Sequence, residues 1–134
     1  MAKLEYVEGI GKVYAKKLNG AGVRSTQALL RQGATPEGRK AISKAAGVSD
    51  KLLLEWINHV DLFRITGVGE EYADLLEEAG VDTVPELAQR KPEHLHEALK
   101  ATNDKKKLVR QLPGLGRVKA WVAEAKKLPR VIKY

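Results

Sequence analysis

The 134-residue chain carries 24 Lys and Arg against 17 Asp and Glu, a formal net charge of +7, and 43% of its residues are hydrophobic. This is enough apolar material for a small core, built mainly from Leu, Val, Ile and Ala because aromatic residues make up only 5%. The absence of cysteine excludes disulfides, thiolate nucleophiles and Cys-based metal sites. Because no apolar run approaches a membrane span and no signal-peptide segment is evident, we expect a soluble cytoplasmic protein without a membrane partner.

Helix-start and helix-stop signals divide the first half of the chain into four expected helices. Gly22 is a typical helix stop, and Pro36 suits a first helical turn. Ser25 and Ser49 are residues that cap helix N-termini. The expected helices run from Lys12 to Ala21, from the Ser25 cap over Ala28–Leu30, from Pro36 to about Ala46, and from the Ser49 cap to Val60. Residues 32–38 are the best loop candidate.

The second half repeats this order of signals. Its expected helices run from Glu70 to Ala79, from a Thr83 cap, from near Pro92, from an Asn103 or Asp104 cap through Gln111, and from about Arg117 to Lys127. Residues 128–134 form a short tail. No stretch alternates convincingly for a strand, so the sequence predicts an all-α fold.

A short pattern occurs three times: Gly-apolar-Gly with an Ala four residues after the second glycine. The copies are 9–11 with Ala15, 67–69 with Ala73, and 114–116 with Ala120. Glycine permits the backbone angles of a tight hairpin, and the Ala leaves room for a neighbouring helix. A hairpin that opens a helix also directs free backbone N–H groups outward, where they can bind a phosphate oxygen.

The first two copies belong to a longer duplication. A shift of 58 residues lays Tyr14 on Tyr72, and 21–23 on the identical Ala-Gly-Val of 79–81. A looser turn at 46–50 holds the same place in the first half that 112–117 holds in the second half. We therefore expect two units, residues 1–62 and 63–134, each with two hairpins.

These stretches resemble a known motif and a known family. Glu8–Gly11 with Ala15, and Leu112–Gly116 with Ala120, look like helix-hairpin-helix motifs. Nearly the whole chain, most specifically 61–83, resembles a prokaryotic family of tandem helix-hairpin-helix proteins classed as a domain of unknown function. The resemblance implies two tandem helix-hairpin-helix pairs packed as a compact helical (SAM-like) bundle. Through the superfamily it also implies sequence-independent DNA binding by the hairpin backbone.

Charge is distributed unevenly along the chain. Residues 1–60 carry a net charge of +5, residues 61–100 carry −6, and residues 101–134 carry +8. Cations follow the first and third Gly-x-Gly copies, whereas Glu70, Glu71 and Asp74 follow the second. Carboxylates at a helix N-terminus compete with an incoming phosphate, so 67–69 is expected to pack and not to bind. The expected phosphate-binding residues are Gly9, Ile10, Gly11, Lys12 and Lys16, and Gly114, Leu115, Gly116, Arg117 and Lys119.

Other residues have simpler interpretations. Trp56 and Trp121 lie on apolar stripes, so core packing is expected in preference to base stacking. Tyr14 and Tyr72 occupy equivalent repeat positions, which indicates a packing role. Lys105–Lys107 are open to two interpretations, a phosphate contact or a solvated helix face. His94 and His96, two residues apart, would lie on different faces of a helix, so no metal site is expected.

An enzymatic function is not expected. Leu112–Arg117 resembles the hairpin of helix-hairpin-helix DNA glycosylases, in which a catalytic Lys follows the second glycine by two residues. Val118 occupies that position here, and Lys119 lies one step beyond on a different helical face. No Ser-His-Asp set, phosphate-loop lysine motif or metal-binding carboxylate cluster stands out, so neither a cofactor nor a metal is expected. The acidic residues between 70 and 78 are interpreted as one exposed helical face: Glu70, Glu71, Asp74, Glu77 and Glu78.

Two functions from different classes remain. The favoured one is sequence-independent binding of a nucleic-acid backbone, with DNA as the expected form, through hairpin amides and the surrounding Lys and Arg. The alternative is a protein–protein adaptor or a self-associating scaffold, which would dock through the acidic segment 70–86. Under this alternative the Gly-x-Gly turns would serve architecture alone, joining helices in a scaffold used for protein contacts.

Overall fold

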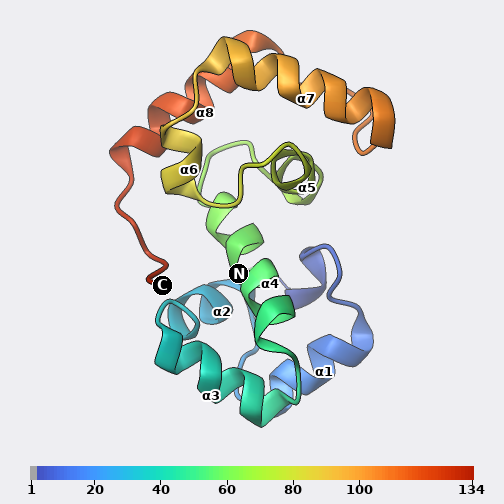
Figure 1. The fold of residues 1–134 in the computed structure, drawn as a ribbon. Helices are drawn as coiled ribbons and strands as arrows, with labels where there is room; N and C mark the ends of the chain where they lie inside the picture. Colours follow the sequence, from blue (N-terminus) through green and yellow to red (C-terminus); the bar gives the residue numbers. More distant parts are fainter. Residues whose placement is uncertain (1–2) are drawn as a thin grey trace. The chain divides into compact units, whose positions relative to one another are not determined.

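The computed structural model describes residues 3–134, and every regular element in this range is a helix. The all-α expectation is therefore confirmed. None of these helices has the combination of length and apolar character needed to cross a membrane. The elements in chain order are η1 (Leu4–Tyr6), α1 (Lys12–Gly20), α2 (Thr26–Gln32), α3 (Pro36–Ala46), α4 (Asp50–Leu62), α5 (Glu70–Glu78), α6 (Val84–Ala88), α7 (Pro92–Lys106) and α8 (Leu115–Lys127) (Figure 1).

The chain folds into two units. The first runs to Asp61 and also includes Val131–Tyr134, whereas the second comprises Leu62–Arg130. The sequence analysis placed the boundary one residue later and assigned the whole tail to the second unit. The assignment of the last four residues differs from the prediction, because they pack on the first unit.

Local capping defines the helices of the first unit. The Ser25 hydroxyl accepts a hydrogen bond from Ala28 N at 3.1 Å, as the sequence predicted. Ser49 likewise accepts from Leu52 N at 3.1 Å. The expected long loop at 32–38 is shorter, because α2 continues to Gln32 and Pro36 already begins α3. Helix α1 packs against η1 and α3, and α2 packs against α3.

Specific contacts hold the C-terminal tail on the first unit. Ile132 is buried at 2% exposure, and Lys133 N donates to Ala34 O at 2.7 Å. Arg39 donates to Lys133 O at 2.7 Å and lies over the Tyr134 ring. These bonds give the tail a defined conformation that its sequence pattern does not reveal.

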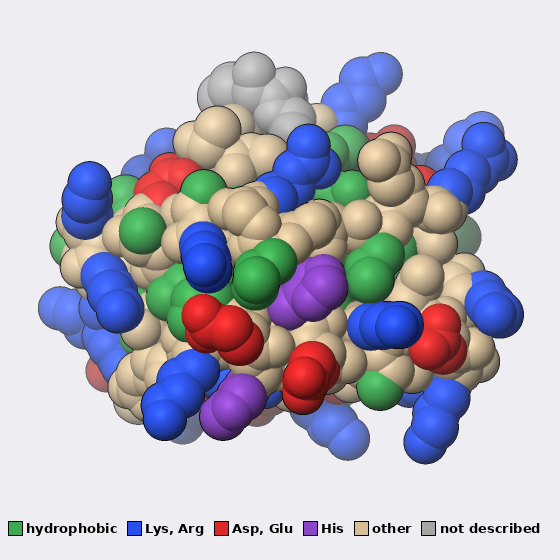
Figure 2. All heavy atoms as spheres, turned by 90° about the horizontal axis from the view of Figure 1, so that it is seen from above, with side chains coloured by type: hydrophobic (Ala, Val, Ile, Leu, Met, Phe, Trp, Pro, Cys, Tyr) green, Lys and Arg blue, Asp and Glu red, His purple; other side chains and the backbone are tan. Residues whose placement is uncertain are grey.

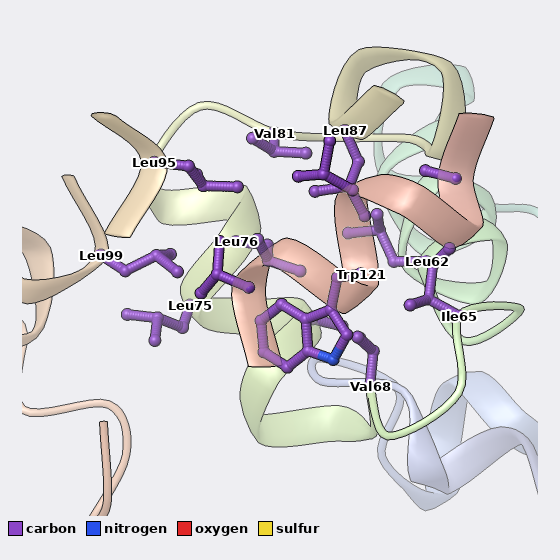
Figure 3. Close-up of a cluster of buried hydrophobic side chains, with 14 of the residues drawn as sticks. Leu62, Ile65, Val68, Leu75, Leu76, Val81, Leu87, Leu95, Leu99 and Trp121 are labelled. Atoms are coloured by element: carbon purple, nitrogen blue, oxygen red, sulfur yellow. The ribbon is translucent and has the colours of Figure 1, made fainter. Parts of the chain in front are cut away.

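The second unit has its own apolar core. Helix α8 packs against α6 and α7, and α5 packs against α7. Trp121 lies in the middle of the cluster in Figure 3, with leucines from α5 and α7 around it. Its fully buried members include Leu62, Ile65, Leu75, Leu76, Val81, Val84, Leu87, Leu95, Leu99, Val118 and Trp121.

The second unit differs from the sequence predictions at three places. Asn103 does not cap a separate helix; α7 continues to Lys106, and residues 107–114 form a loop. The Asn103 side chain bonds this loop, accepting from Val109 N at 2.9 Å and donating to Val109 O at 3.2 Å. Thr83 stands before α6 but makes no side-chain cap. Finally, α8 begins at Leu115, two residues earlier than predicted.

Candidate functional site

The first two Gly-apolar-Gly turns have the same backbone. Gly9 and Gly67 adopt φ of +92° and +87°, angles that favour glycine over any other residue. In each turn the apolar residue is buried and its amide bonds three residues back: Ile10 N to Val7 O at 3.0 Å, and Val68 N to Ile65 O at 3.1 Å. The second glycine of each turn is the N-cap of the helix that follows, α1 or α5.

A tryptophan lies against the first glycine of each turn. A β-carbon on Gly9 would lie 3.3 Å from Trp56 Nε1, and one on Gly67 would lie 3.6 Å from Trp121 Nε1. In Figure 3 the nitrogen edge of Trp121 faces Val68 of its turn. The two tryptophans are 2% and 1% exposed, and they pack against Tyr14 and Tyr72 at ring-centroid distances of 5.0 and 5.3 Å. The expected packing role of all four aromatic residues is confirmed.

The third Gly-apolar-Gly copy forms a different structure. Gly114 has φ −70° and is itself the N-cap of α8, so Leu115 and Gly116 are already helical. Ala120 is exposed, whereas Ala15 and Ala73 are buried. The sequence predicted a third copy of the hairpin, and this prediction is wrong. In its place, α8 corresponds to α4, with Gly114 standing where Ser49 caps α4.

The start of α1 combines free amides with cations. Gly11 supplies no side-chain cap, and no acidic residue lies in the first turn. Lys12, Lys16 and Lys17 are exposed, and Val13 between them is 69% exposed. The expected residues Gly9–Gly11, Lys12 and Lys16 therefore lie together at one helix start, with only Ile10 buried in the core.

The start of α5 has the same backbone and the opposite charge. Glu70 and Glu71 occupy its first turn. The preceding turn is also bonded within the unit, because Glu124 of α8 accepts from Thr66 N at 3.0 Å and from the Thr66 hydroxyl at 3.2 Å. A carboxylate of the protein thus already occupies the edge of this turn.

The acidic face of α5 is less open than its sequence indicates. Glu70, Asp74 and Glu77 are half-buried, and only Glu71 and Glu78 are exposed. Glu78 forms an ion pair with Lys106 at the end of α7. The expectation of one fully exposed acidic face is therefore corrected, because α5 packs against α7 and part of its charge faces its own unit.

Cations also surround the start of α8. Gly114, Gly116, Arg117 and Lys119 are exposed, Leu115 is half-buried, and the first turn holds no acidic residue. Arg117 lies over the Tyr72 ring at 5.8 Å and donates to the Tyr72 hydroxyl at 3.3 Å. The preceding loop adds Lys107 and Arg110, both exposed. The sequence predicted a helix through Gln111, so it did not indicate that these two cations lie on a loop.

Charges of both signs are mixed on the surface. In the view of Figure 2, Lys and Arg side chains extend outward with Asp, Glu and His between them. Within residues 3–134, no three His, Asp or Glu side chains converge as metal ligands would.

Comparison with known proteins assigns the family. The chain belongs to the family described as "Domain of unknown function (DUF4332)", whose sequence profile matches residues 8–128. This confirms the expected membership of a domain family of unknown function, and the family description names neither an activity nor a helix-hairpin-helix motif. Comparisons with curated proteins and with solved structures gave no match.

Proposed function

We propose that the protein binds the phosphate backbone of nucleic acid, with DNA as the expected form, and does not read base sequence. The observation that carries the proposal is the start of α1, where an uncapped first turn without carboxylates is surrounded by exposed Lys12, Lys16 and Lys17. Backbone amides supply hydrogen-bond donors to phosphate oxygens, and the lysines supply charge. We further propose that the hairpins before α1 and α5 are of the helix-hairpin-helix type.

The start of α8 is proposed as a second contact. Gly114 offers no side-chain cap, and exposed Arg117 and Lys119 lie in the first turn and a half of the helix. The turn before α5 is excluded from the interface, because Glu70 and Glu71 occupy its helix start and Glu124 bonds Thr66. The proposed contacts are backbone amides and surrounding cations that bind phosphate oxygens, so the affinity would depend on phosphates and not on base sequence.

Fluorescence anisotropy with labelled duplexes of unrelated sequence tests this proposal. With roughly three to five phosphates neutralised, the slope of log K against log salt should be about −3 to −4, and it should be equal for all duplexes. Absence of binding at high micromolar protein in low salt would overturn the proposal. If sedimentation then showed concentration-dependent assembly, the adaptor alternative through segment 70–86 would replace it.

A further inference from the structure

The two units differ most in the connection before their last helix. In the first unit, residues 47–49 join α3 to α4, and Gly47 provides the left-handed turn at φ +71°. In the second unit, residues 107–114 join α7 to α8, five residues more, and α7 is itself four residues longer than α3. The first unit is complete without these extra residues. The composition and the ordered conformation of the longer connection therefore need a separate explanation.

The inserted loop is built to a defined conformation. Asn103 bonds both the amide and the carbonyl of Val109, which is buried at 8% exposure. The Tyr72 hydroxyl donates to Gln111 O at 3.1 Å and so ties the loop to α5. Lys107 adopts the left-handed conformation, φ +54° and ψ +46°, which a non-glycine residue adopts at some cost. The loop is therefore held by side-chain contacts at Val109 and Gln111, in its middle part.

This ordered loop holds two cations, Lys107 and Arg110, and no acidic residue. Between Lys105 and Ala123 the sequence contains six cations and no acidic residue. Lys106 is paired with Glu78, whereas Lys105, Lys107 and Arg110 project from the loop and the end of α7 as exposed side chains. Exposed like charges close together in sequence repel one another, and a partner with closely spaced negative charges relieves that repulsion.

We propose that residues 105–110 form an additional phosphate-contacting surface, here named the basic loop, that binds the backbone of duplex DNA. This rests on the proposed function and extends it from helix starts to side chains of the inserted loop. A phosphodiester backbone fits better than an acidic protein surface, because it presents regularly repeated charges without intervening cations. The bonds to the Val109 backbone fix the position from which Arg110 extends, which lowers the backbone entropy that the loop loses on binding.

The test uses a substitution that the backbone itself favours. Lys107→Gly removes a charge at a left-handed position, so the melting temperature should not fall. Combined with Arg110→Gln, it should reduce the affinity for a duplex of about 20 base pairs by about 50-fold at 100 mM salt, and make the salt slope shallower by about 2. The matched control is Lys40→Gln with Lys44→Gln, which removes two exposed lysines of α3.

The outcomes separate the two proposals. If the unaltered protein binds and the loop variant binds no worse than the α3 control, the basic loop is overturned while the proposed function stands. If the unaltered protein does not bind, both fall. Should the double variant lose helical circular dichroism, Arg110→Gln alone carries the test. That variant is expected to bind about eightfold more weakly with a slope shallower by about 1, and an unchanged slope would contradict the proposal.

Discussion

Helices α1 and α5 start from turns of the same backbone, yet their exposed side chains differ in charge. Gly9 and Gly67 share their positive φ, and each contacts a buried tryptophan. After the turn, the first unit places Lys12 and exposed Val13 where the second places Glu70 and Glu71. The packing contacts of the turn are thus common to both copies, whereas only the first copy has a helix start with lysine and without carboxylates. Similar architecture in two units therefore does not imply similar binding.

The largest expected effects concern what the copies share. Trp56→Ala and Trp121→Ala should each lower the free energy of unfolding by about 3–5 kcal/mol, because each removes a buried indole and leaves a cavity beneath a turn. Urea denaturation followed by circular dichroism measures the loss. A loss below about 1 kcal/mol for either variant would show that the two tryptophans are not structurally equivalent.

Alanine substitutions of the glycines should have different effects on stability in the first two hairpins and in the third copy of the pattern. Gly9→Ala and Gly67→Ala should each cost about 1–2 kcal/mol, because a β-carbon is disfavoured at their positive φ. Gly116→Ala is the control, since Gly116 is helical and nothing lies near its missing β-carbon. It should leave stability unchanged or raise it by up to about 1 kcal/mol. Thermal melts of the three variants check this, and equal losses would contradict the distinction.

The smallest expected effect sharpens the contrast in binding. Gly11→Ser and Gly69→Ser place a capping hydroxyl at an extended N-cap, which should stabilise each helix by about a few tenths of a kcal/mol. At Gly11 the hydroxyl takes an amide proposed to bind phosphate, so affinity for duplex DNA should fall several-fold. At Gly69 the affinity should not change. Paired melts and anisotropy titrations measure both quantities, and a loss of affinity at Gly69 would contradict the unequal roles.

Much of the fold follows from the sequence because its signals are local. Pro36 begins α3, and Ser25 caps α2. The first glycine of each of the first two hairpins, Gly9 or Gly67, has a positive φ that only glycine adopts readily. The duplication then fixes which elements correspond. Apolar stripes and equivalent repeat positions indicated the packing roles of Trp56, Trp121, Tyr14 and Tyr72, but not the ring contacts that pair each tyrosine with a tryptophan.

What the sequence could not predict depends on contacts between distant residues. Asn103 has the composition of a helix cap, and only the bonds to Val109 show that it holds a loop. The third Gly-x-Gly matches the first two in letters, but Gly114 lacks the positive φ of a hairpin. The tail at 131–134 shows no periodicity, and its order comes from Ala34 and Arg39, about a hundred residues earlier.

For the candidate site, too, the sequence predicted the local features and not the contacts between distant residues. Charge runs in the sequence correctly singled out the exposed lysines at α1, since solvation keeps Lys at the surface. They overstated the acidic face of α5, because packing against α7 half-buries three of its carboxylates. The bond from Thr66 to Glu124 joins two elements far apart in sequence, and no local pattern indicates it.

The most direct test of nucleic-acid binding at α1 is a charge reversal with a matched control. Lys12→Glu with Lys16→Glu should weaken binding to duplex DNA by at least about 50-fold at 100 mM salt and make the salt slope shallower by about 2. Stability should be unchanged or slightly higher, because a carboxylate at position 12 favours the helix dipole. Lys40→Glu with Lys44→Glu makes the same charge change on exposed positions of α3 and should weaken binding far less. Equal losses for the two pairs, or no loss for either, would contradict a phosphate site at the start of α1.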